Sequence, residues 1–428
     1  MLIAGEASGD LLGAELVRAL RKEFATLPAV YTDDQQPLTT PLEPRFIGAG
    51  GPLMKAAGVE LEDDFTAHSI IGLWEVLGSA MTFRRFFYRL FRLALERQPD
   101  VVVFIDFGGF NLRLAHKIRK YVRGHADWFH RWQPKLVQVV SPQVWGSRAN
   151  RAYRIADDYD LLLSTVPFEK KWYSRRVPKL PVVFIGNPIV DRYAGYRMGS
   201  RETMTPLATT GEAGKVIERT PKVALFPGSR IGEVRRHVPL LMAVARQMNF
   251  VRPCEFTMVL PNEMLMRESQ DLLKDFSAIR LQVRDLGEAL NRSDLAITKS
   301  GTVTLECAWF EVPAIVFYKT SFVTYLAART LARVKYLAMP NLIADEMLFP
   351  EFLQYSASPE TIAGAALNLL RDEARRKYVR QKLAEVVQTL GEPGVMERAA
   401  QIIIRLRYSG KNAIQAAAAR EFVEGISL

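Results

Sequence analysis

Two glycine-containing loops in the second half of the chain have the composition of a phosphate-binding site. The first reads PGSR (residues 227–230) and joins an apolar run to a helical pattern that begins near Gly232. Gly228 lets the backbone approach an anion, and Ser229 precedes a helix N-terminus with free N–H groups and partial positive charge. Arg230 adds a planar fork that suits a diphosphate. The alternative is an ordinary strand–helix turn with an exposed arginine.

The second loop reads SGT (residues 300–302) and leads into a helix that carries Glu306. Small hydroxyl residues and a glycine at a helix N-terminus form a phosphate nest, and a carboxylate one turn later can accept ribose hydroxyls. The alternative is that Ser300 or Thr302 caps the helix and Glu306 completes a capping box. Two such loops favour a nucleotide-diphosphate pocket. Because the chain has neither G-x-x-x-x-G-K-[ST] nor G-x-G-x-x-G, we expect a sugar nucleotide.

Carboxylates follow two apolar runs in the first half of the chain. Asp106 ends the run VVVFID, where a partly desolvated carboxylate can act as the general base that inverting glycosyl transfer needs. The alternative is that Asp106 bonds to neighbouring backbone amides. Glu6 lies in GEASGD after the first apolar run. Helix capping can account for Ser8 and Asp10 but not for Glu6, so we expect Glu6 to face a ligand.

The segment SPQVWGSR supplies two further candidates at another strand end. Trp145 could stack on a sugar ring, and Arg148 could bind an anion. A buried tryptophan without a ligand is an equally ordinary alternative. Together with the carboxylates, these residues suggest an acceptor side of the site.

The segment Thr82–Arg97 predicts a basic amphipathic helix. Large aromatic residues and arginines together suit a surface that lies on anionic lipid. The alternative is a core helix with a solvated arginine face. The candidate membrane-facing residues are Phe83, Phe86, Phe87 and Leu90, and the basic residues are Arg84, Arg85, Arg89 and Arg92.

Alternating strands and helical patterns predict an α/β fold with parallel sheets, and 428 residues favour two domains. We expect a Rossmann-like domain at 1–194, a connection at 195–220, a second Rossmann-like domain with terminal helices at 221–408, and a helix-prone tail at 409–428. Ligands would bind at the carboxyl ends of both sheets. The predicted strands are 1–4, 45–48, 101–105, 136–140, 161–164, 182–185, 223–226, 255–260, 281–283, 295–298 and 314–318.

The composition argues against several other kinds of site. Cys254 and Cys307 form no C-x-x-C pair, and the five histidines form no H-E-x-x-H motif, so we expect neither a disulfide framework nor a metal site. The first ten residues lack the apolar core of a signal peptide, and no run approaches the roughly 18 apolar residues of a membrane span. The net charge of +11 suits nucleic acid, an anionic membrane or phosphorylated substrates.

In their order and spacing, the motifs resemble the lipid-A-disaccharide synthase family from Met1 to about Tyr408. The resemblance implies a GT-B fold, with two doubly wound domains facing a central cleft, and an inverting hexosyltransferase. The donor would be UDP-2,3-diacylglucosamine and the acceptor 2,3-diacylglucosamine 1-phosphate, giving a β-1,6-linked disaccharide 1-phosphate and UDP. The matching segments read GEASGD, GAGGPLM, GLWEVLG, IDFGGFNLRLA, SPQVWGSR, PFE, GNPIVD, PGSRIGEV, SGTVTLE, YKTSFVTYLA and VKYLAMPNLIADEMLFPEFLQ.

The resemblance also implies roles for single residues and partners. Asp106 becomes the candidate base, and Arg230 the catalytic contact to the donor phosphate. We expect no cofactor and no nucleic acid, since the UDP-sugar is a substrate. The protein would bind peripherally to the cytoplasmic face of a Gram-negative inner membrane, and its apolar C-terminal helices suggest a homodimer. The candidate donor site comprises Gly228, Ser229, Arg230, Glu233, Ser300, Gly301, Thr302, Thr304, Glu306, Asn341 and Gln354, and the candidate acceptor side comprises Glu6, Ser8, Gly9, Asp10, Trp145 and Arg148.

Two neighbouring positions depart from the family pattern. A proline and an aspartate usually stand two and three residues after the first aspartate, where this chain has Gly108 and Gly109. A second carboxylate near Asp106 is therefore missing. We expect either lower activity or a larger role for Glu6 or Asp10.

Other functions predict different patterns. Another GT-B enzyme, such as a peptidoglycan-precursor glucosaminyltransferase or a UDP-sugar epimerase, would lack the segment PNLIADEMLFPEFLQ. A nucleic-acid-binding protein would gather its basic residues along one groove with stacking aromatics, whereas here most of them are scattered. A family member that binds UDP or lipid without turnover is a third alternative, because of Gly108 and Gly109.

Overall fold

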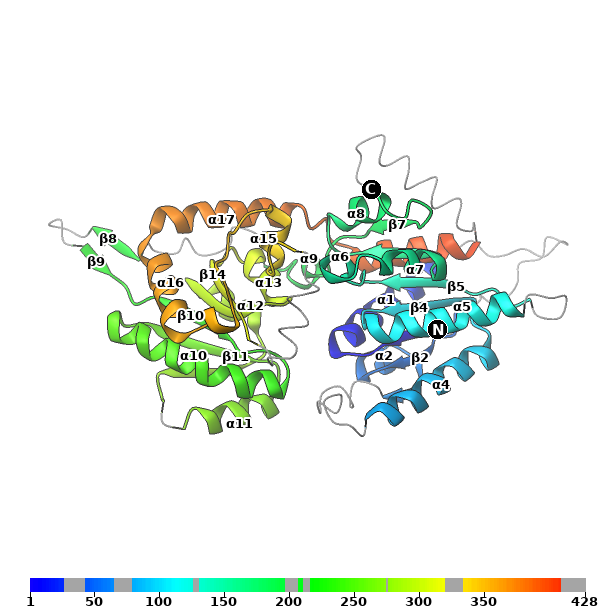
Figure 1. The fold of residues 1–428 in the computed structure, drawn as a ribbon, viewed down its shortest axis with the longest axis horizontal. Helices are drawn as coiled ribbons and strands as arrows, with labels where there is room; N and C mark the ends of the chain where they lie inside the picture. Colours follow the sequence, from blue (N-terminus) through cyan, green and yellow to red (C-terminus); the bar gives the residue numbers. More distant parts are fainter. Residues whose placement is uncertain are drawn as a thin grey trace. The chain divides into compact units, whose positions relative to one another are not determined.

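The structure, a computed structural model, forms two compact units (Figure 1). The first contains Met1–Asp191 together with the chain from Glu392 onward, and the second contains Arg192–Gly391. Part of the predicted connection, the motif GLWEVLG, most of YKTSFVTYLA and the tail at 409–428 lie outside the described residues. The structure describes residues 1–26, 43–64, 79–125, 131–196, 207–210, 216–274, 276–319 and 334–408.

The first unit is built on a seven-stranded parallel sheet with the order β3-β2-β1-β4-β5-β6-β7. The strand order reverses between β1 and β4, and open α/β sheets bind ligands at such a point. The strands are β1 (Leu2–Ala4), β2 (Ile47–Gly50), β3 (Glu60–Asp64), β4 (Val101–Ile105), β5 (Lys135–Val139), β6 (Leu161–Ser164) and β7 (Val182–Phe184).

Alternate side chains of these strands enter two hydrophobic cores, one on each face of the sheet. Val103 and Ile105 of β4 pack with α1 in one core, and Val102 and Phe104 pack with α4 and α5 in the other. The unbroken apolar run of β4 therefore reflects burial on both faces. The helices are α1 (Ala7–Thr26), α2 (Pro52–Ala56), α4 (Ser79–Arg97), α5 (Gly108–Gly124), α6 (Val144–Ser147), α7 (Arg151–Asp158), α8 (Glu169–Ser174) and α9 (Ile189–Arg192).

The last described helix, at 395–408, returns to the first unit. Val395 and Leu406 are fully buried in the core that contains α1. The Asp191 carboxylate accepts the backbone amides of Gly394 and Val395 at 2.6 and 2.8 Å. This differs from the predicted domain boundary at 408, because an amphipathic pattern does not show which core receives a helix. The prediction of a homodimer relied on the apolar residues of the C-terminal helices. Most of those of the helix at 395–408 are buried in the core of the first unit.

The aromatic face of α4 packs into the core of the first unit, so the prediction of a membrane-facing aromatic surface is wrong. Phe86 and Leu90 are only 6% and 0% exposed. Phe83, Phe86 and Phe87 all contact the ring of Phe110 on α5, with centroids 5.0 to 5.8 Å apart. The arginines occupy the outer face. The helix is therefore a core helix with a solvated basic surface.

The second unit is built on a six-stranded parallel sheet with the order β12-β11-β10-β13-β14-β15. Its strand order reverses between β10 and β13. A short antiparallel pair, β8 (Ala208–Thr210) and β9 (Val216–Glu218), lies in the segment predicted as a connection. The other strands are β10 (Lys222–Phe226), β11 (Glu255–Leu260), β12 (Ile279–Val283), β13 (Leu295–Lys299), β14 (Ala314–Tyr318) and β15 (Glu351–Leu353).

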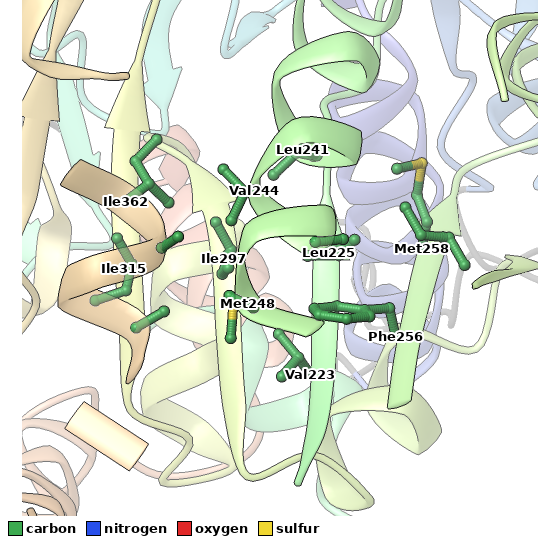
Figure 2. Close-up of a cluster of buried hydrophobic side chains, with 14 of the residues drawn as sticks. Val223, Leu225, Leu241, Val244, Met248, Phe256, Met258, Ile297, Ile315 and Ile362 are labelled. Carbon is green, nitrogen blue, oxygen red and sulfur yellow. The ribbon is translucent and has the colours of Figure 1, made fainter. Parts of the chain in front are cut away.

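One hydrophobic core fixes the helices of the second unit on this sheet (Figure 2). Val223 and Leu225 of β10 pack against Val244 and Met248 of α10, and Ile362 of α16 joins the same cluster. None of the described helices in either unit is long and apolar enough to cross a membrane. The helices are α10 (Ile231–Val251), α11 (Glu263–Leu272), α12 (Leu286–Asn291), α13 (Val303–Trp309), α15 (Met339–Ala344), the 3₁₀ helix η2 (Gln354–Ser356), α16 (Pro359–Arg371) and α17 (Glu373–Gln388).

Candidate active site

The two glycine-containing loops of the second unit lie next to each other at the carboxyl edge of its sheet. They follow β10 and β13, which are parallel neighbours from the pair Val223 and Leu295 to the pair Phe226 and Thr298. The strand order reverses at this place, where doubly wound sheets bind nucleotides. The structure thus brings the PGSR and SGT loops together, as the sequence predicts.

The shape of the PGSR loop requires glycine at position 228. Gly228 has a φ of +132°, and a Cβ added there would lie 2.4 Å from Oε2 of Glu233. The same oxygen accepts the backbone amides of Ser229 and Arg230 at 2.9 and 3.4 Å. The Glu233 carboxylate therefore closes the N-terminus of α10 from within the protein. The sequence predicts Glu233 as a ligand contact in the donor site. The structure corrects this, because Glu233 organises the donor loop through contacts inside the protein.

Lys299, which the sequence analysis did not single out, connects the two loops. Its Nζ donates to Oε1 of Glu233 at 2.7 Å. Its stem runs past Gly301, where an added Cβ would lie 3.6 Å from Lys299 Cε. Burial acts to raise the pKa of Glu233, but Lys299 and the Ser229 amide outweigh it, so the pKa lies below its ordinary value. An ion pair therefore holds the loops together. Its only sequence signal is a lysine at the end of a strand.

His237 contacts the PGSR loop from the interior of the second unit. The sequence alone did not identify this role. Its side chain is buried, with Nδ1 2.6 Å from the carbonyl oxygen of Pro227 and Nε2 3.1 Å from that of Lys319. The ring stands edge-on to Phe317, with centroids 5.0 Å apart. The imidazole therefore connects the segments that follow β10 and β14. Its contacts are 10 and 82 residues away in sequence, beyond what local pattern reveals.

The SGT loop is held by the backbone around it and presents its own tip to solvent. The Ser300 hydroxyl donates to Leu337 O at 3.1 Å, and the buried Thr304 hydroxyl donates to Gly301 O at 2.7 Å. Thr302 is the N-cap residue of α13, but its side chain makes no capping bond. The capping-box alternative is therefore wrong. Gly301 and Thr302 are exposed, as a phosphate contact would require.

Glu306 lies one turn into α13 and is only 6% exposed. Its Oε1 accepts Arg192 Nη1 at 3.1 Å and the Tyr193 hydroxyl at 3.2 Å. Burial raises the pKa of Glu306, and the charge of Arg192 opposes that shift only in part. One carboxylate oxygen is therefore already used inside the second unit, which limits what Glu306 can offer to a ribose.

Asn341 is fully buried and uses both ends of its amide within the protein. Its Nδ2 donates to Phe349 O and Glu351 Oε1, and its Oδ1 accepts the amides of Leu348 and Phe349. Glu351 also accepts the amide of Leu337, whose carbonyl holds the Ser300 hydroxyl. Asn341 is therefore a positioning residue behind the SGT loop, which corrects its placement beside the nucleotide.

Gln354 lies at the end of β15 and is also largely buried. It is 8% exposed, and its backbone has a φ of +47°. A positive φ at a residue other than glycine costs free energy and persists only where the surroundings hold it. The strain marks the segment after β15 as a constrained part of the same carboxyl edge, since β15 pairs in parallel with β14.

In the first unit, Asp106 stands where β4 ends, beside the end of β1. Asp106 and Phe107 both have positive φ, +50° and +48°, so two successive strained residues turn the chain into α5. The Asp106 carbonyl accepts the side-chain amides of Asn111 at 2.7 Å and Gln138 at 3.3 Å. Gly5 is needed nearby, because an added Cβ would lie 2.4 Å from the Phe107 ring. The geometry fixes the direction of the Asp106 backbone.

The GEASGD segment divides into ligand-accessible and structural residues. Glu6 is half-buried and Ser8 is exposed at the first turn of α1. Asp10 is 2% exposed, and its carboxylate accepts three backbone amides at the N-terminus of α2, from Gly51, Leu53 and Met54. This corrects its assignment to the acceptor side and removes it as a substitute carboxylate. Gly9 is buried, and a Cβ added there would lie 3.3 Å from Cβ of Ala4 in β1, closer than an ordinary van der Waals contact.

Trp145 belongs to the interior of the first unit, so the prediction that it stacks on a sugar is corrected. It is 8% exposed, and its Nε1 donates to Glu169 Oε1 at 2.8 Å. The Ser164 hydroxyl lies 2.9 Å from the other carboxyl oxygen of Glu169. Burial raises the pKa of Glu169 to about 7, against the effect of these hydrogen bonds. Arg148, by contrast, is exposed, as an anion contact requires.

The fold of the chain matches a known class of protein. The calicheamicin glycosyltransferase CalG4 superimposes with a TM-score of 0.54 at 15% identity, covering 95% of this chain and 97% of that chain. Two parallel-sheet α/β domains with this neighbour define the GT-B fold, so the predicted fold class is confirmed.

Sequence comparison identifies the family within that class. A family model described as lipid-A-disaccharide synthetase matches residues 1–405. Lipid-A-disaccharide synthase 1 of Legionella pneumophila subsp. pneumophila is 32% identical over 400 residues, which cover 91% of this chain and 92% of that protein. Lipid-A-disaccharide synthase of Geobacter sulfurreducens is 33% identical over 411 residues, which cover 95% and 96%. The chain belongs to the lipid-A-disaccharide synthase family of glycosyltransferases.

Proposed function

We propose that this protein joins UDP-2,3-diacylglucosamine to 2,3-diacylglucosamine 1-phosphate and releases UDP. The product is the β-1,6-linked disaccharide 1-phosphate. The observation that carries this proposal is the paired PGSR and SGT loops at the switch point of the second sheet, in a chain that matches the family model at residues 1–405.

The donor diphosphate binds at these loops. Arg230 precedes α10 and has an exposed side chain, and the tip of the second loop offers Gly301 and Thr302. Lys299 holds the two loops together through its ion pair with Glu233 and adds no net charge. Arg230 and the positive end of α13 can balance the leaving diphosphate, so we propose that the reaction needs no metal ion.

Asp106 acts as the general base. It takes the proton from the 6-hydroxyl of the acceptor as that oxygen attacks the anomeric carbon of the donor, while the bond to UDP breaks on the opposite face. The supporting observation is its strained position at the end of β4, next to the half-buried Glu6 segment. A fixed base within hydrogen-bond reach of the hydroxyl contributes typically 10²- to 10⁴-fold in rate.

The protein acts at the cytoplasmic face of the inner membrane, which it binds through charge. The outer face of α4 supports this, because Arg84, Arg85 and Arg92 are exposed there and Met81 is 84% exposed. Arginine side chains near an anionic bilayer each contribute about 1 kcal/mol. The aromatic residues of α4 stay in the core, so electrostatic attraction takes the place of the aromatic insertion expected from the sequence.

The reaction is tested with the purified full-length protein, radiolabelled UDP-2,3-diacylglucosamine and the acceptor 1-phosphate in detergent. We expect disaccharide formation, equal with and without EDTA. Asp106→Asn should abolish turnover and leave UDP affinity unchanged. Absence of disaccharide from the unmodified protein would overturn the proposal, and near-normal turnover by Asp106→Asn would remove Asp106 as the base.

A further inference from the structure

Three arginines lie at the carboxyl edge of the first sheet, and among the described residues none of them has a carboxylate partner. Arg148 follows α6, Arg151 begins α7, and Arg113 lies in the second turn of α5. All three side chains are exposed. Within the described residues, no ion pair joins any of these three arginines to a carboxylate. They form a positively charged patch, called here the arginine cluster.

Arg151 lies next to Arg148, because its backbone amide donates to the carbonyl oxygen of Arg148 at 2.9 Å. The pKa of Arg151 lies below its ordinary value, first through partial burial and then through the positive charges of Arg148, Arg113 and Arg154. The N-terminus of α7 adds further partial positive charge at the same place. Like charges held together in this way raise the free energy of the unliganded protein. A bound anion would relieve that repulsion.

Toward the opposite end of α5, two arginines have partners on the segment from α7 to β6. Arg119 of α5 bonds to the Asp160 carboxylate at 2.6 Å. Arg123 donates to the backbone carbonyl of Asp157 at 2.7 Å. On α5, Arg119 is therefore paired with a carboxylate, whereas Arg113 has no such ion pair within the described residues.

The arginine cluster borders the loop that carries the candidate base. β4 and β5 are parallel neighbours, so the loops that follow them share one edge of the sheet. A Cβ added at Gly108 would lie 3.4 Å from Cβ of Pro142. The turn after Asp106 therefore touches the segment that leads to Arg148.

We propose that Arg113, Arg148 and Arg151 form an anion subsite that binds the phosphate monoester of the acceptor sugar. This inference rests on the proposed function for the identity of the acceptor. Guanidinium groups bind phosphate oxygens in bidentate fashion, and several of them match a dianionic phosphate. The acceptor carries its phosphate on C1 and its reacting hydroxyl on C6, which is attached to C5, and C1 and C5 flank the ring oxygen. The candidate base and the proposed phosphate subsite lie on the adjoining loops after β4 and β5, so both could contact one acceptor sugar.

The test compares two acceptors, 2,3-diacylglucosamine 1-phosphate and the same sugar with a free 1-hydroxyl. We expect Arg151→Gln and Arg113→Gln each to reduce kcat/KM for the phosphorylated acceptor by roughly 10- to 100-fold, mainly through KM. Activity on the 1-hydroxyl acceptor and the KM for the UDP-sugar should stay unchanged. Lys120→Gln is the matched control, because Lys120 is exposed on α5, the helix that carries Arg113. An equal loss on both acceptors, or no loss on either, overturns the subsite.

A binding experiment separates this inference from the proposed function and from lipid binding. By calorimetry, soluble glucosamine 1-phosphate should bind the unmodified protein and should bind Arg151→Gln at least tenfold more weakly. That result supports the subsite even if no disaccharide forms, and absence of binding to the unmodified protein overturns it. Co-sedimentation with phosphatidylglycerol vesicles should be the same for both proteins. A selective loss of vesicle binding in Arg151→Gln would assign the arginine cluster to membrane headgroups and overturn the acceptor subsite.

Discussion

Lys299 Nζ donates to Glu233 Oε1 at 2.7 Å and so joins the loop after β13 to the helix that follows β10. The other oxygen of Glu233 holds the amides of Ser229 and Arg230. One carboxylate thus organises both sides of the candidate donor site. The pKa of Glu233 lies below its ordinary value of 4.5, so the ion pair stabilises the loops above about pH 4.5. That stabilisation is lost as the pH falls through the lowered pKa.

Replacing Lys299 by methionine should weaken UDP binding by roughly tenfold or more, because a charge-assisted hydrogen bond contributes about 1.5–3 kcal/mol. Methionine keeps the length of the stem beside Gly301 but removes the charge. Isothermal calorimetry with UDP measures the change. Lys274→Met is the control, because Lys274 and its partner Asp271 are both 73% exposed. Equal UDP affinity in the unmodified protein and Lys299→Met would show that the ion pair does not support the donor site.

Replacing Gly228 by alanine should disrupt the donor loop while leaving the fold intact. The new methyl group would lie 2.4 Å from Glu233 Oε2, at a φ that alanine rarely adopts. We expect a loss of stability of about 1–3 kcal/mol and UDP binding too weak to measure. Gly364→Ala is the matched control, since nothing lies within 4 Å of an added Cβ in α16. Its stability should rise by up to about 1 kcal/mol. Normal UDP affinity in Gly228→Ala would refute the requirement for glycine.

The buried strands and the strand-end loops could be predicted because their signals are local. Unbroken apolar runs such as Val101–Ile105 indicate strands covered on both faces, and a parallel sheet brings its strand ends to one edge. β3 was missed because its sequence, ELEDD, is acidic. The helix at 395–408 was assigned to the wrong core for a different reason, since its apolar pattern is the same whichever unit buries it.

The contacts that position the site could not be predicted, because they join residues far apart in the chain. Lys299 lies 66 residues from Glu233, and His237 lies 82 residues from Lys319. Helical spacing likewise shows that Phe86 and Leu90 share a face of α4. It does not show whether lipid or the protein core covers that face, and here the core does.

Removing two charges from the outer face of α4 should weaken binding to anionic membranes. Arg84→Gln with Arg85→Gln should reduce co-sedimentation with phosphatidylglycerol vesicles by about 1 kcal/mol per charge, and the effect should fade as salt rises. Arg371→Gln with Lys377→Gln, both exposed in the second unit, removes the same charge elsewhere. If both double variants lose the same amount, net charge and not α4 determines the binding.

Replacing Glu169 by glutamine should change how stability depends on pH. The folded pKa is raised from 4.5 to about 7, so the unmodified protein loses stability as the pH rises from about 4.5 through about 7. Glutamine keeps the bond from Trp145 and cannot ionise. The stability of Glu169→Gln relative to the unmodified protein should therefore increase between pH 5 and pH 8, by on the order of 2–3 kcal/mol. Urea unfolding at both pH values measures this, with Glu96→Gln as an exposed control. A difference that does not change with pH would contradict a buried, neutral Glu169.

Restoring a carboxylate at position 109 tests whether its absence limits the enzyme. Gly109 lies in the first turn of α5, is exposed, and has nothing within 4 Å of an added Cβ, so aspartate fits without strain. An acidic residue at this end of a helix is also favourable by about 0.3–1 kcal/mol. If a second carboxylate assists Asp106, Gly109→Asp should raise kcat by roughly tenfold.

The matched variant Gly109→Asn has nearly the same shape but no charge, so the comparison isolates the carboxylate. A higher kcat in Gly109→Asp alone, with equal UDP affinity in all three proteins, would show that the missing charge limits proton transfer. Equal kcat in both variants and in the unmodified protein would show that the missing carboxylate at position 109 does not limit turnover. Glu6, half-buried in the first turn after β1, would then be the next residue to replace.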